Sequence, residues 1–199
     1  MIFSYNMLLD RYSNYAAPKM KIKRMVEKGQ LYLVRPGIYV DDREISKYAL
    51  AHIIYGPSYI SFETALSYHG IIPERAKNII SATTHKNRNK QFSNMFGDYY
   101  YKDVPQDVFP YGVAIEKDRQ GNIYRMATPE KALLDTLYKI NNVESIKKMK
   151  TLLFEDLRIE EESLMNMDID FINEVGPLYK KKNIELFIRL VRKICTTNK

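Results

Sequence analysis

The chain has 199 residues, of which 45% are hydrophobic and 28% are charged, and its formal net charge is +7. This length and apolar content predict a folded core, either in one medium domain or in a small domain followed by a larger one. The single cysteine excludes an intrachain disulfide framework, and the positive charge favours a polyanionic partner, although ordinary cytosolic proteins also carry such a balance.

The N-terminus does not resemble a secretory signal. Residues 1–9 are apolar only in patches, and Asp10 and Arg11 interrupt them. The longest apolar stretch, residues 48–55, is far shorter than the roughly 20 residues that cross a bilayer. We therefore expect a soluble, cytoplasmic protein with no membrane partner.

The chain begins with a pattern that predicts two short helices. Ser4 can cap a helix over residues 5–12, and residues 13–17 then form a turn. Pro18 fits the first turn of a second helix, because the N–H at that position has no intrahelical partner. Gly29 ends this second helix, where a positive φ is favoured.

A β-hairpin is predicted directly after the second helix. Two short β-type runs, residues 31–34 and 38–40, flank the turn tripeptide of residues 35–37. A basic helix followed by a small hairpin is typical of the recognition helix and wing of a winged helix-turn-helix. The intervening helix of the full motif is abbreviated or missing here.

Basic residues concentrate in this segment. Between Lys19 and Gly37 there are six basic residues against one acidic residue, a density that suits the neutralisation of DNA phosphates. The predicted DNA contacts are Lys19, Lys21, Lys23, Arg24, Lys28 and Arg35. The alternative remains open that this charge run is only the solvated face of a short helix.

The following residues predict the first elements of a larger α+β domain. Residues 41–44 have the pattern of a capping box and predict a helix that continues to about Tyr55, and Ser61 can cap a second helix over residues 62–69. Residues 85–94 are polar and predict a loop. Four segments predict the strands of a mostly antiparallel sheet: 78–84, 97–104, 112–116 and 122–126.

The remainder of the chain predicts helices. Thr128, Pro129 and Glu130 combine a cap, a first-turn proline and an acid at the positive end of the helix dipole. Further helices are predicted over residues 143–154 and 168–175 and in an amphipathic C-terminal segment. The fold class predicted is α+β, with a winged helix-turn-helix in residues 1–43 and a larger domain with a mostly antiparallel sheet and C-terminal helices in residues 44–199.

The sequence offers little catalytic or metal-binding chemistry. None of the three histidines, His52, His69 and His85, has the spacing to a second ligand that zinc sites use, and no phosphate-cradling glycine motif is present. Asp168 and Asp170 lie before a predicted helix, so helix capping explains them better than metal binding. We therefore predict no metal, no cofactor and no enzymatic activity.

Two features leave alternatives open. An enzymatic interpretation survives only if carboxylates such as Glu63, Glu130 and Asp135 meet around a metal ion. The basic face of the C-terminal helix can extend a nucleic-acid surface or can pair with residues 155–170, where seven acidic residues stand against one basic residue. Cys195 is aligned with the apolar face of this helix, which favours a packing role.

A second candidate contact with nucleic acid is the basic loop that contains Lys86, Arg88 and Lys90. Its basic and amide side chains suit phosphate contacts. A solvated hairpin loop explains the same composition equally well.

Three segments, in order, resemble the AbiEi family of antitoxins from type IV toxin–antitoxin systems. The first is K-I-K-R-M-V-E-K-G-Q-L-Y-L-V-R-P-G-I-Y, from Lys21 to Tyr39. The second is P-S-Y-I-S-F-E-T-A-L-S-Y-H-G-I-I-P-E, from Pro57 to Glu74. The third is A-T-P-E-K-A-L-L-D-T-L-Y, from Ala127 to Tyr138. The chain departs from the family where residues 14–17 replace the helix before the recognition helix.

The resemblance implies a two-domain regulator. Its N-terminal winged helix would bind inverted repeats in operator DNA and repress its own operon, with the basic residues named above in the matching helix and wing. Its larger domain would counter an AbiEii-type nucleotidyltransferase toxin without a stable complex, as part of defence against bacteriophage. The alternative is an RNA- or protein-binding regulator with a vestigial winged helix and no antitoxin role.

Overall fold

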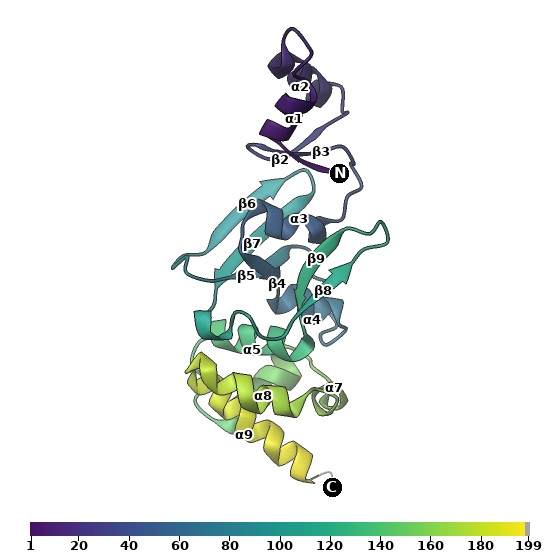
Figure 1. Ribbon diagram of the computed structural model, residues 1–199. Helices are drawn as coiled ribbons and strands as arrows, with labels where there is room; N and C mark the ends of the chain where they lie inside the picture. The colour runs from purple at the N-terminus through teal and green to yellow at the C-terminus, as the bar shows by residue number, and fades with distance from the viewer. Residues whose placement is uncertain (198–199) are drawn as a thin grey trace.

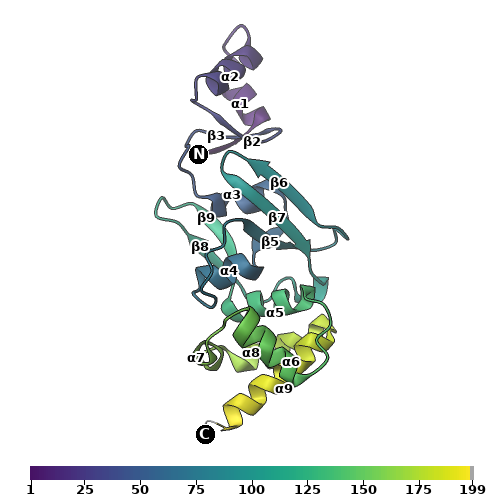
Figure 2. The same cartoon turned by 180° about the vertical axis from the view of Figure 1, so that it is seen from behind.

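Three parts follow one another along the long axis of the molecule in the computed structural model, which describes residues 1–197 and the side chains of residues 1–194 (Figures 1 and 2). An N-terminal unit, residues 1–43, lies at one end. A six-stranded sheet with its helices lies in the middle, and a group of C-terminal helices lies at the other end. The mixed α+β content predicted from the sequence is confirmed. Cys195 lies outside the described side chains.

The N-terminal unit contains two helices and a three-stranded antiparallel sheet in the order β1-β3-β2. Its elements are β1 (Ile2–Ser4), α1 (Tyr5–Arg11), α2 (Pro18–Glu27), β2 (Tyr32–Arg35) and β3 (Ile38–Val40). Both helices start where the sequence predicted, because the Ser4 hydroxyl accepts the N–H of Met7 and a proline opens α2. Gly29 follows α2 with a φ of +65°. Strand β1 was not predicted, and it pairs with β3 along the whole of its length.

The small sheet is covered on both faces. Phe3, Leu31 and Tyr39 pack with the apolar sides of α1 and α2. Val34 and Val40 point the other way and join the core of the following part. This alternation follows from the period of two along a strand. The N-terminal unit therefore shares one face of its sheet with the rest of the chain.

The larger sheet has the strand order β6-β7-β5-β4-β9-β8. It contains β4 (Ser58–Ile60), β5 (Ile79–Thr83), β6 (Lys90–Asn94), β7 (Gly97–Asp103), β8 (Val113–Lys117) and β9 (Ile123–Ala127). The pairings of β4 with β9 and of β5 with β7 are parallel, and the other three are antiparallel. Most pairings are therefore antiparallel, as predicted, but the sheet is mixed, because the two parallel pairings were not predicted.

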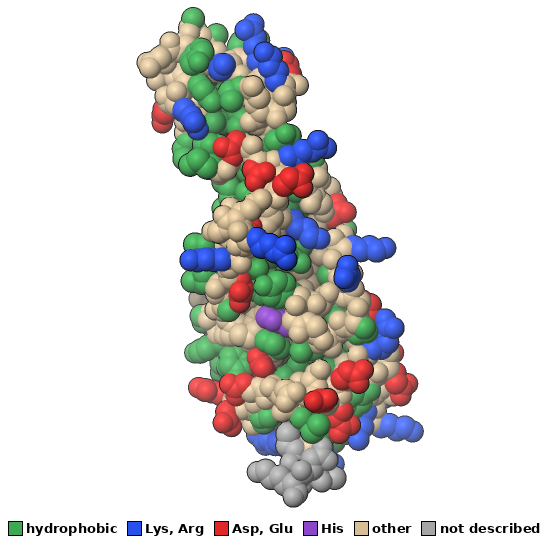
Figure 3. Space-filling view, turned by 90° about the vertical axis from the view of Figure 1, so that its right-hand side faces the viewer, with side chains coloured by type: hydrophobic (Ala, Val, Ile, Leu, Met, Phe, Trp, Pro, Cys, Tyr) green, Lys and Arg blue, Asp and Glu red, His purple; other side chains and the backbone are tan. Residues whose placement is uncertain are grey.

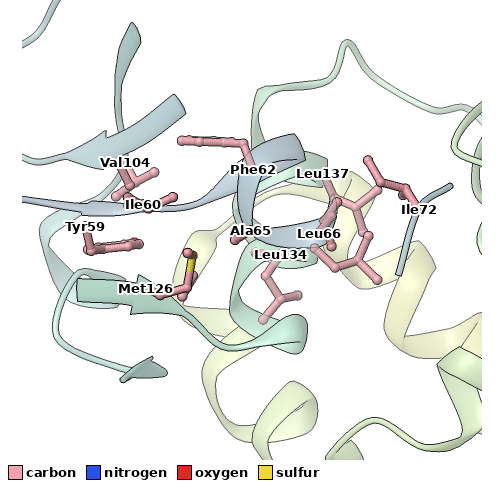
Figure 4. Packing of buried hydrophobic residues seen from close by; sticks show 14 of the residues in the cluster. Tyr59, Ile60, Phe62, Ala65, Leu66, Ile72, Val104, Met126, Leu134 and Leu137 are labelled. Atoms are coloured by element: carbon pink, nitrogen blue, oxygen red, sulfur yellow. The ribbon is translucent and has the colours of Figure 1, made fainter. Parts of the chain in front are cut away.

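Helices pack around this sheet and continue beyond it. They are α3 (Lys47–Ile54), α4 (Phe62–Tyr68), α5 (Pro129–Lys139), α6 (Ile146–Thr151), α7 (Glu161–Met165), α8 (Ile169–Val175) and α9 (Lys182–Thr197), with short helical turns η1 (Gln106–Val108), η2 (Leu152–Asp156) and η3 (Gly176–Tyr179). Figure 4 shows the core between the sheet and these helices, where Ile60 and Met126 from paired strands lie near Leu134 of α5. Within the described residues, no helix has both the length and the apolar character to cross a membrane.

Two predicted segments differ in the structure. The helix predicted to open at residues 41–44 begins later, because the Asp42 carboxylate accepts the N–H of Glu44 in a turn and Ser46 caps α3 through the N–H of Tyr48. The loop predicted over residues 85–94 contains β6. A strand with only one large apolar residue, Phe92, gives no alternating pattern, and β6 forms by pairing with β7.

Candidate nucleic-acid interface

Helix α2 presents its basic residues on the side that faces away from the protein. Ile22 is buried at 2% exposure, and Met25 and Val26 are half-buried against α1 and the small sheet. The cations occupy the remaining sides of the helix. Lys19, Lys23, Arg24 and Lys28 are exposed, and Lys21 is half-buried. An apolar stripe against the domain and a basic face toward solvent are the arrangement predicted from the sequence.

These cations have few intramolecular counter-charges. Lys23 Nζ lies 3.9 Å from the Glu27 carboxylate, and both side chains are exposed, so this pair contributes little to stability. Lys21 Nζ lies 4.9 Å from the centre of the Tyr15 ring, which favours a cation without neutralising it. The helix surface therefore retains net positive charge for an external anion.

Hollows flank α2 on two sides. One, of about 440 Å³, lies between the turn before α2 and its C-terminal end and is lined by Tyr15, Met20, Arg24 and Lys28, among others. The other, of about 390 Å³, lies between α2 and the small sheet. Figure 3 shows Lys and Arg side chains at this end of the molecule beside exposed hydrophobic ones. Helix α2 thus forms a ridge between two depressions.

Arg35 has a different environment from the other predicted contacts. Its Nη1 donates to the carbonyl oxygen of Ile54, at the end of α3, over 2.7 Å. Its Nε is buried without a hydrogen-bond partner. The guanidinium therefore joins the β2–β3 hairpin to the rest of the chain, and this geometry supports a structural role for Arg35.

The second basic segment lies apart from α2. Strand β6 runs from Lys90 to Asn94, and only its Asn94 end reaches the N-terminal unit, where the Asn94 side chain donates to the carbonyl of Val34 over 2.9 Å. The loop with Lys86 and Arg88 is therefore at the far end of this strand (Figures 1 and 2). Lys86 Nζ lies 5.2 Å from the centre of the Tyr55 ring. The structure does not bring the two predicted basic groups onto one continuous surface.

The histidines and acidic residues do not converge on a metal site. His69 Nε2 lies 2.8 Å from the carbonyl of Ala127, and burial, with the nearby Arg125, lowers the pKa of His52. Among the described side chains, those of residues 1–194, no group of three or more His, Cys, Asp and Glu is placed to hold a metal ion. The absence of enzymatic activity and of a cofactor stays a prediction.

The three carboxylates that the enzymatic interpretation needs are each engaged elsewhere. Glu63 lies 3.5 Å from Lys102, and Glu130 accepts the backbone N–H of Asp168 over 3.1 Å. Asp135 is fully buried with Lys131. They do not form a cluster.

Asp135 belongs to a buried polar network that the sequence did not reveal. Its Oδ1 accepts from Lys131 Nζ at 2.7 Å and from the Tyr179 hydroxyl at 2.6 Å, and its Oδ2 accepts from the hydroxyls of Tyr59 at 2.9 Å and Ser61 at 2.6 Å. Burial outweighs the attraction of Asp135 and lowers the pKa of Lys131. The available signal was an i,i+4 Lys–Asp pair on the side of α5 that also carries buried leucines.

The chain was also compared with known proteins. It matches no model of a protein family and no curated protein sequence.

Proposed function

We propose that this protein is a DNA-binding repressor of its own operon, in which α2 is the recognition helix of a winged helix-turn-helix, and that it is the antitoxin for a nucleotidyltransferase toxin. The observation that carries the proposal is the basic, solvent-facing side of α2, supported from behind by α1 and a small sheet. The operator would contain inverted repeats, as the resemblance to AbiEi antitoxins implies.

The order of the elements supports the winged-helix assignment. A strand, two helices and a hairpin follow one another, and the first strand pairs with the second strand of the hairpin. The turn between the helices spans residues 12–17. In helix-turn-helix proteins the second helix enters the major groove, and its companion crosses the backbone. With this order of elements, α2 is the helix that would enter the major groove of DNA.

The chemistry of α2 fits phosphate contact. Lys19 and Lys23 reach solvent from successive turns of α2, and Lys28 is exposed at its C-terminal end. Each lysine that neutralises a phosphate releases a condensed counterion, so affinity would fall steeply with salt. Arg24, which is exposed on α2 beside the hollow of about 440 Å³, can donate two hydrogen bonds to one guanine. Phosphate contacts would position the helix, and Arg24 would contribute to the choice of sequence.

The antitoxin role rests on the resemblance, and the packing of the larger unit is consistent with it. The segments at 57–74 and 127–138 are far apart in the sequence, but they lie together in the fold because β4 pairs with β9. The Asp135 network also joins them, through Tyr59 and Ser61. These two of the three segments that carry the resemblance therefore build one shared core, as expected if they define a common fold.

The test is a titration of the full chain against its own upstream DNA and a scrambled duplex at two salt concentrations. We expect preference for the upstream DNA to persist at the higher salt. Lys23→Ala/Arg24→Ala should weaken binding at least tenfold, since it removes two phosphate or base contacts. The matched control is Lys147→Ala/Lys150→Ala, which removes two exposed charges from α6 at the other end of the molecule. Equal loss in both variants, or binding that is the same on both duplexes, would contradict the recognition-helix assignment.

The antitoxin role has a separate test. Coexpression of the full chain should restore the growth of cells that carry a nucleotidyltransferase toxin of this type. Lys23→Ala/Arg24→Ala should retain this rescue, because both side chains are exposed on α2 and lie outside the larger unit. A chain that binds its operator but gives no rescue is a repressor alone.

The alternative, an RNA-binding regulator with a vestigial winged helix, is favoured by one observation. Arg35 is held at Ile54, so the hairpin does not offer the predicted contact at its turn. Competition between the operator duplex and a structured RNA of equal length distinguishes the two functions. RNA that displaces the operator at equal concentration would favour the alternative.

A further inference from the structure

A second cleft lies far from α2, in the larger unit. It has a volume of about 550 Å³ and is bounded by the loop after β5, by the residues after β7 and by the end of α5. Strands β5 and β7 are parallel neighbours, with Thr83 paired to Asp103, so both loops leave the same edge of the sheet. The carboxyl ends of parallel strands are a frequent position for ligands. Residues of the loop between β5 and β6 form one wall of the cleft.

The loop that forms this wall is held in a defined shape. The carboxylate of Asp103 accepts from the backbone N–H groups of Lys86 and Asn87 and from the hydroxyl of Thr83, at 3.0 to 3.2 Å. His85 and Asn87 both have positive φ angles, near +58° and +53°. The Asp103 carboxylate therefore accepts hydrogen bonds within the protein, and these donors offset part of its negative charge.

Thr84 gives the cleft an unused hydrogen-bonding group. Thr84 is one of the residues that line the cleft and is only 8% exposed, and its hydroxyl is buried without a hydrogen-bond partner, so it would reach a ligand by rotation of the side chain toward the cleft. A buried hydroxyl normally has a partner, because leaving it without one costs free energy. A ligand in the cleft would supply the missing partner.

The cleft also carries positive charge. Arg88 and Lys139 line it, and Lys102 and Lys181 lie close enough to Lys139 to disfavour its ammonium form. Burial and these two neighbours outweigh the nearby Asp103 and Asp135 and lower the pKa of Lys139. An anion beside Lys139 would relieve this repulsion.

We propose that this cleft binds a phosphate monoester of mononucleotide size, with Arg88 and Lys139 as its counter-charges and the Thr84 hydroxyl as a donor to a phosphate oxygen. The volume is within the range of small-molecule sites, roughly 300–1,000 Å³. Amide side chains of Asn87 and Asn89, which also line the cleft, can hydrogen-bond the rest of the ligand. This site is separate from α2 and does not depend on DNA binding.

The experiment is a calorimetric titration of the full chain with adenosine 5′-monophosphate and inorganic phosphate, and with adenosine as the uncharged comparison. We expect the monophosphate to bind with a dissociation constant below about 1 mM, inorganic phosphate to compete with it, and adenosine to bind at least tenfold more weakly. No binding by either phosphate compound, or equal binding by adenosine, would overturn the proposal.

Two variants locate the binding. Thr84→Val keeps the shape of the side chain and removes only the hydroxyl, which has no partner within the protein, so it should fold normally while affinity for the monophosphate falls about tenfold. Arg88→Ala/Lys139→Ala should reduce affinity further, and Lys147→Ala/Lys150→Ala on α6 should leave it unchanged. If Thr84→Val and Arg88→Ala/Lys139→Ala both bind the monophosphate as the wild type does, the assignment of this cleft is wrong.

Discussion

Tyr99 and Tyr101 lie two residues apart on β7 and point toward the same side of the sheet, and both are buried. Their hydroxyls differ. The Tyr101 hydroxyl donates to the carbonyl of Ala51 over 2.6 Å, whereas the Tyr99 hydroxyl is buried without a partner. Burial raises the pKa of both phenols well above the usual value of 10.0. The Tyr101 ring is therefore held by a hydrogen bond as well as by packing, whereas the Tyr99 ring is held by packing alone.

This pair predicts opposite effects of the same substitution. Tyr99→Phe should leave the free energy of unfolding at pH 7 unchanged or raise it by up to about 1 kcal/mol, because it removes an unsatisfied hydroxyl. Tyr101→Phe should lower it by about 1 kcal/mol, since the Ala51 carbonyl loses its shorter hydrogen bond and keeps only the one from the N–H of Tyr55 at 3.4 Å. Urea unfolding of both variants measures the difference. A large destabilisation by Tyr99→Phe would mean that this hydroxyl has a partner.

The raised pKa values of Tyr99 and Tyr101 also predict how the free energy of unfolding depends on pH. A phenol whose pKa is raised in the folded protein contributes stability that is present below pH 10 and is lost as the pH rises from there toward the folded value. Stability should therefore fall steeply above pH 10, and less steeply in Tyr99→Phe. Urea unfolding of the wild type and of Tyr99→Phe at a series of pH values above 9 measures both slopes.

Between elements, the Asp135 network joins α5, β4 and η3. Lys131 Nζ also donates to the Tyr179 hydroxyl over 2.6 Å, so one ammonium contacts groups from two elements. Lys131→Met should lower the free energy of unfolding by about 3 kcal/mol, because it leaves the Asp135 carboxylate buried with only hydroxyl donors. Lys147→Met on the exposed side of α6 is the control and should change it by less than about 0.5 kcal/mol. Equal unfolding midpoints of the two variants in urea would show that the ion pair contributes no net stability.

Local chemistry explains which elements could be predicted. The starts of α2 and α5 follow from Pro18 and Thr128, whose effects act within one turn of helix. The predicted start of α3 was wrong because the Asp42 carboxylate accepts a backbone N–H in a turn, just as an N-cap residue does at the start of a helix. Strand β6 pairs with the next strand, β7, across the short turn at residues 95 and 96, but its own residues lack the apolar alternation that predicts a strand. The parallel pairings join strands that are distant in the sequence, and no local pattern encodes them.

The candidate sites also divide into one that local sequence predicts and one that it does not. The exposed cations of α2 are predictable from helical periodicity, since an apolar stripe at Ile22 fixes the opposite face. The cleft beside Thr84 is not, because it is made by the loop after β5, the residues after β7 and the end of α5, which meet only in the folded protein. Arg35 shows how much of the environment of a single side chain the sequence predicts. The sequence places it correctly in a hairpin, but the direction of its side chain is set by α3, which follows later in the chain.

At the scale of the whole molecule, the junction between the N-terminal unit and the larger unit combines apolar and polar contacts. Val34 and Val40 from the small sheet enter the main core. Arg35 and Asn94 add hydrogen bonds in opposite directions, one from each side of the junction. Because this face of the small sheet is covered by the larger unit, we expect the two units to unfold in one transition.

Arg35→Met tests this junction and also the sequence-based assignment of Arg35 to DNA contact. If Arg35 is a structural link, the variant should lower the free energy of unfolding by about 1.5–3 kcal/mol, the contribution of a hydrogen bond to a charged group. It should also increase proteolysis between residues 41 and 46, while the slope of DNA affinity against salt stays unchanged under folded conditions. Arg43→Met, at an exposed residue of this same segment, is the matched control and should change none of the three. If Arg35 instead contacts a phosphate, the magnitude of the slope would fall by about 0.9 with no loss of stability, and the hairpin would then act as a wing at the DNA.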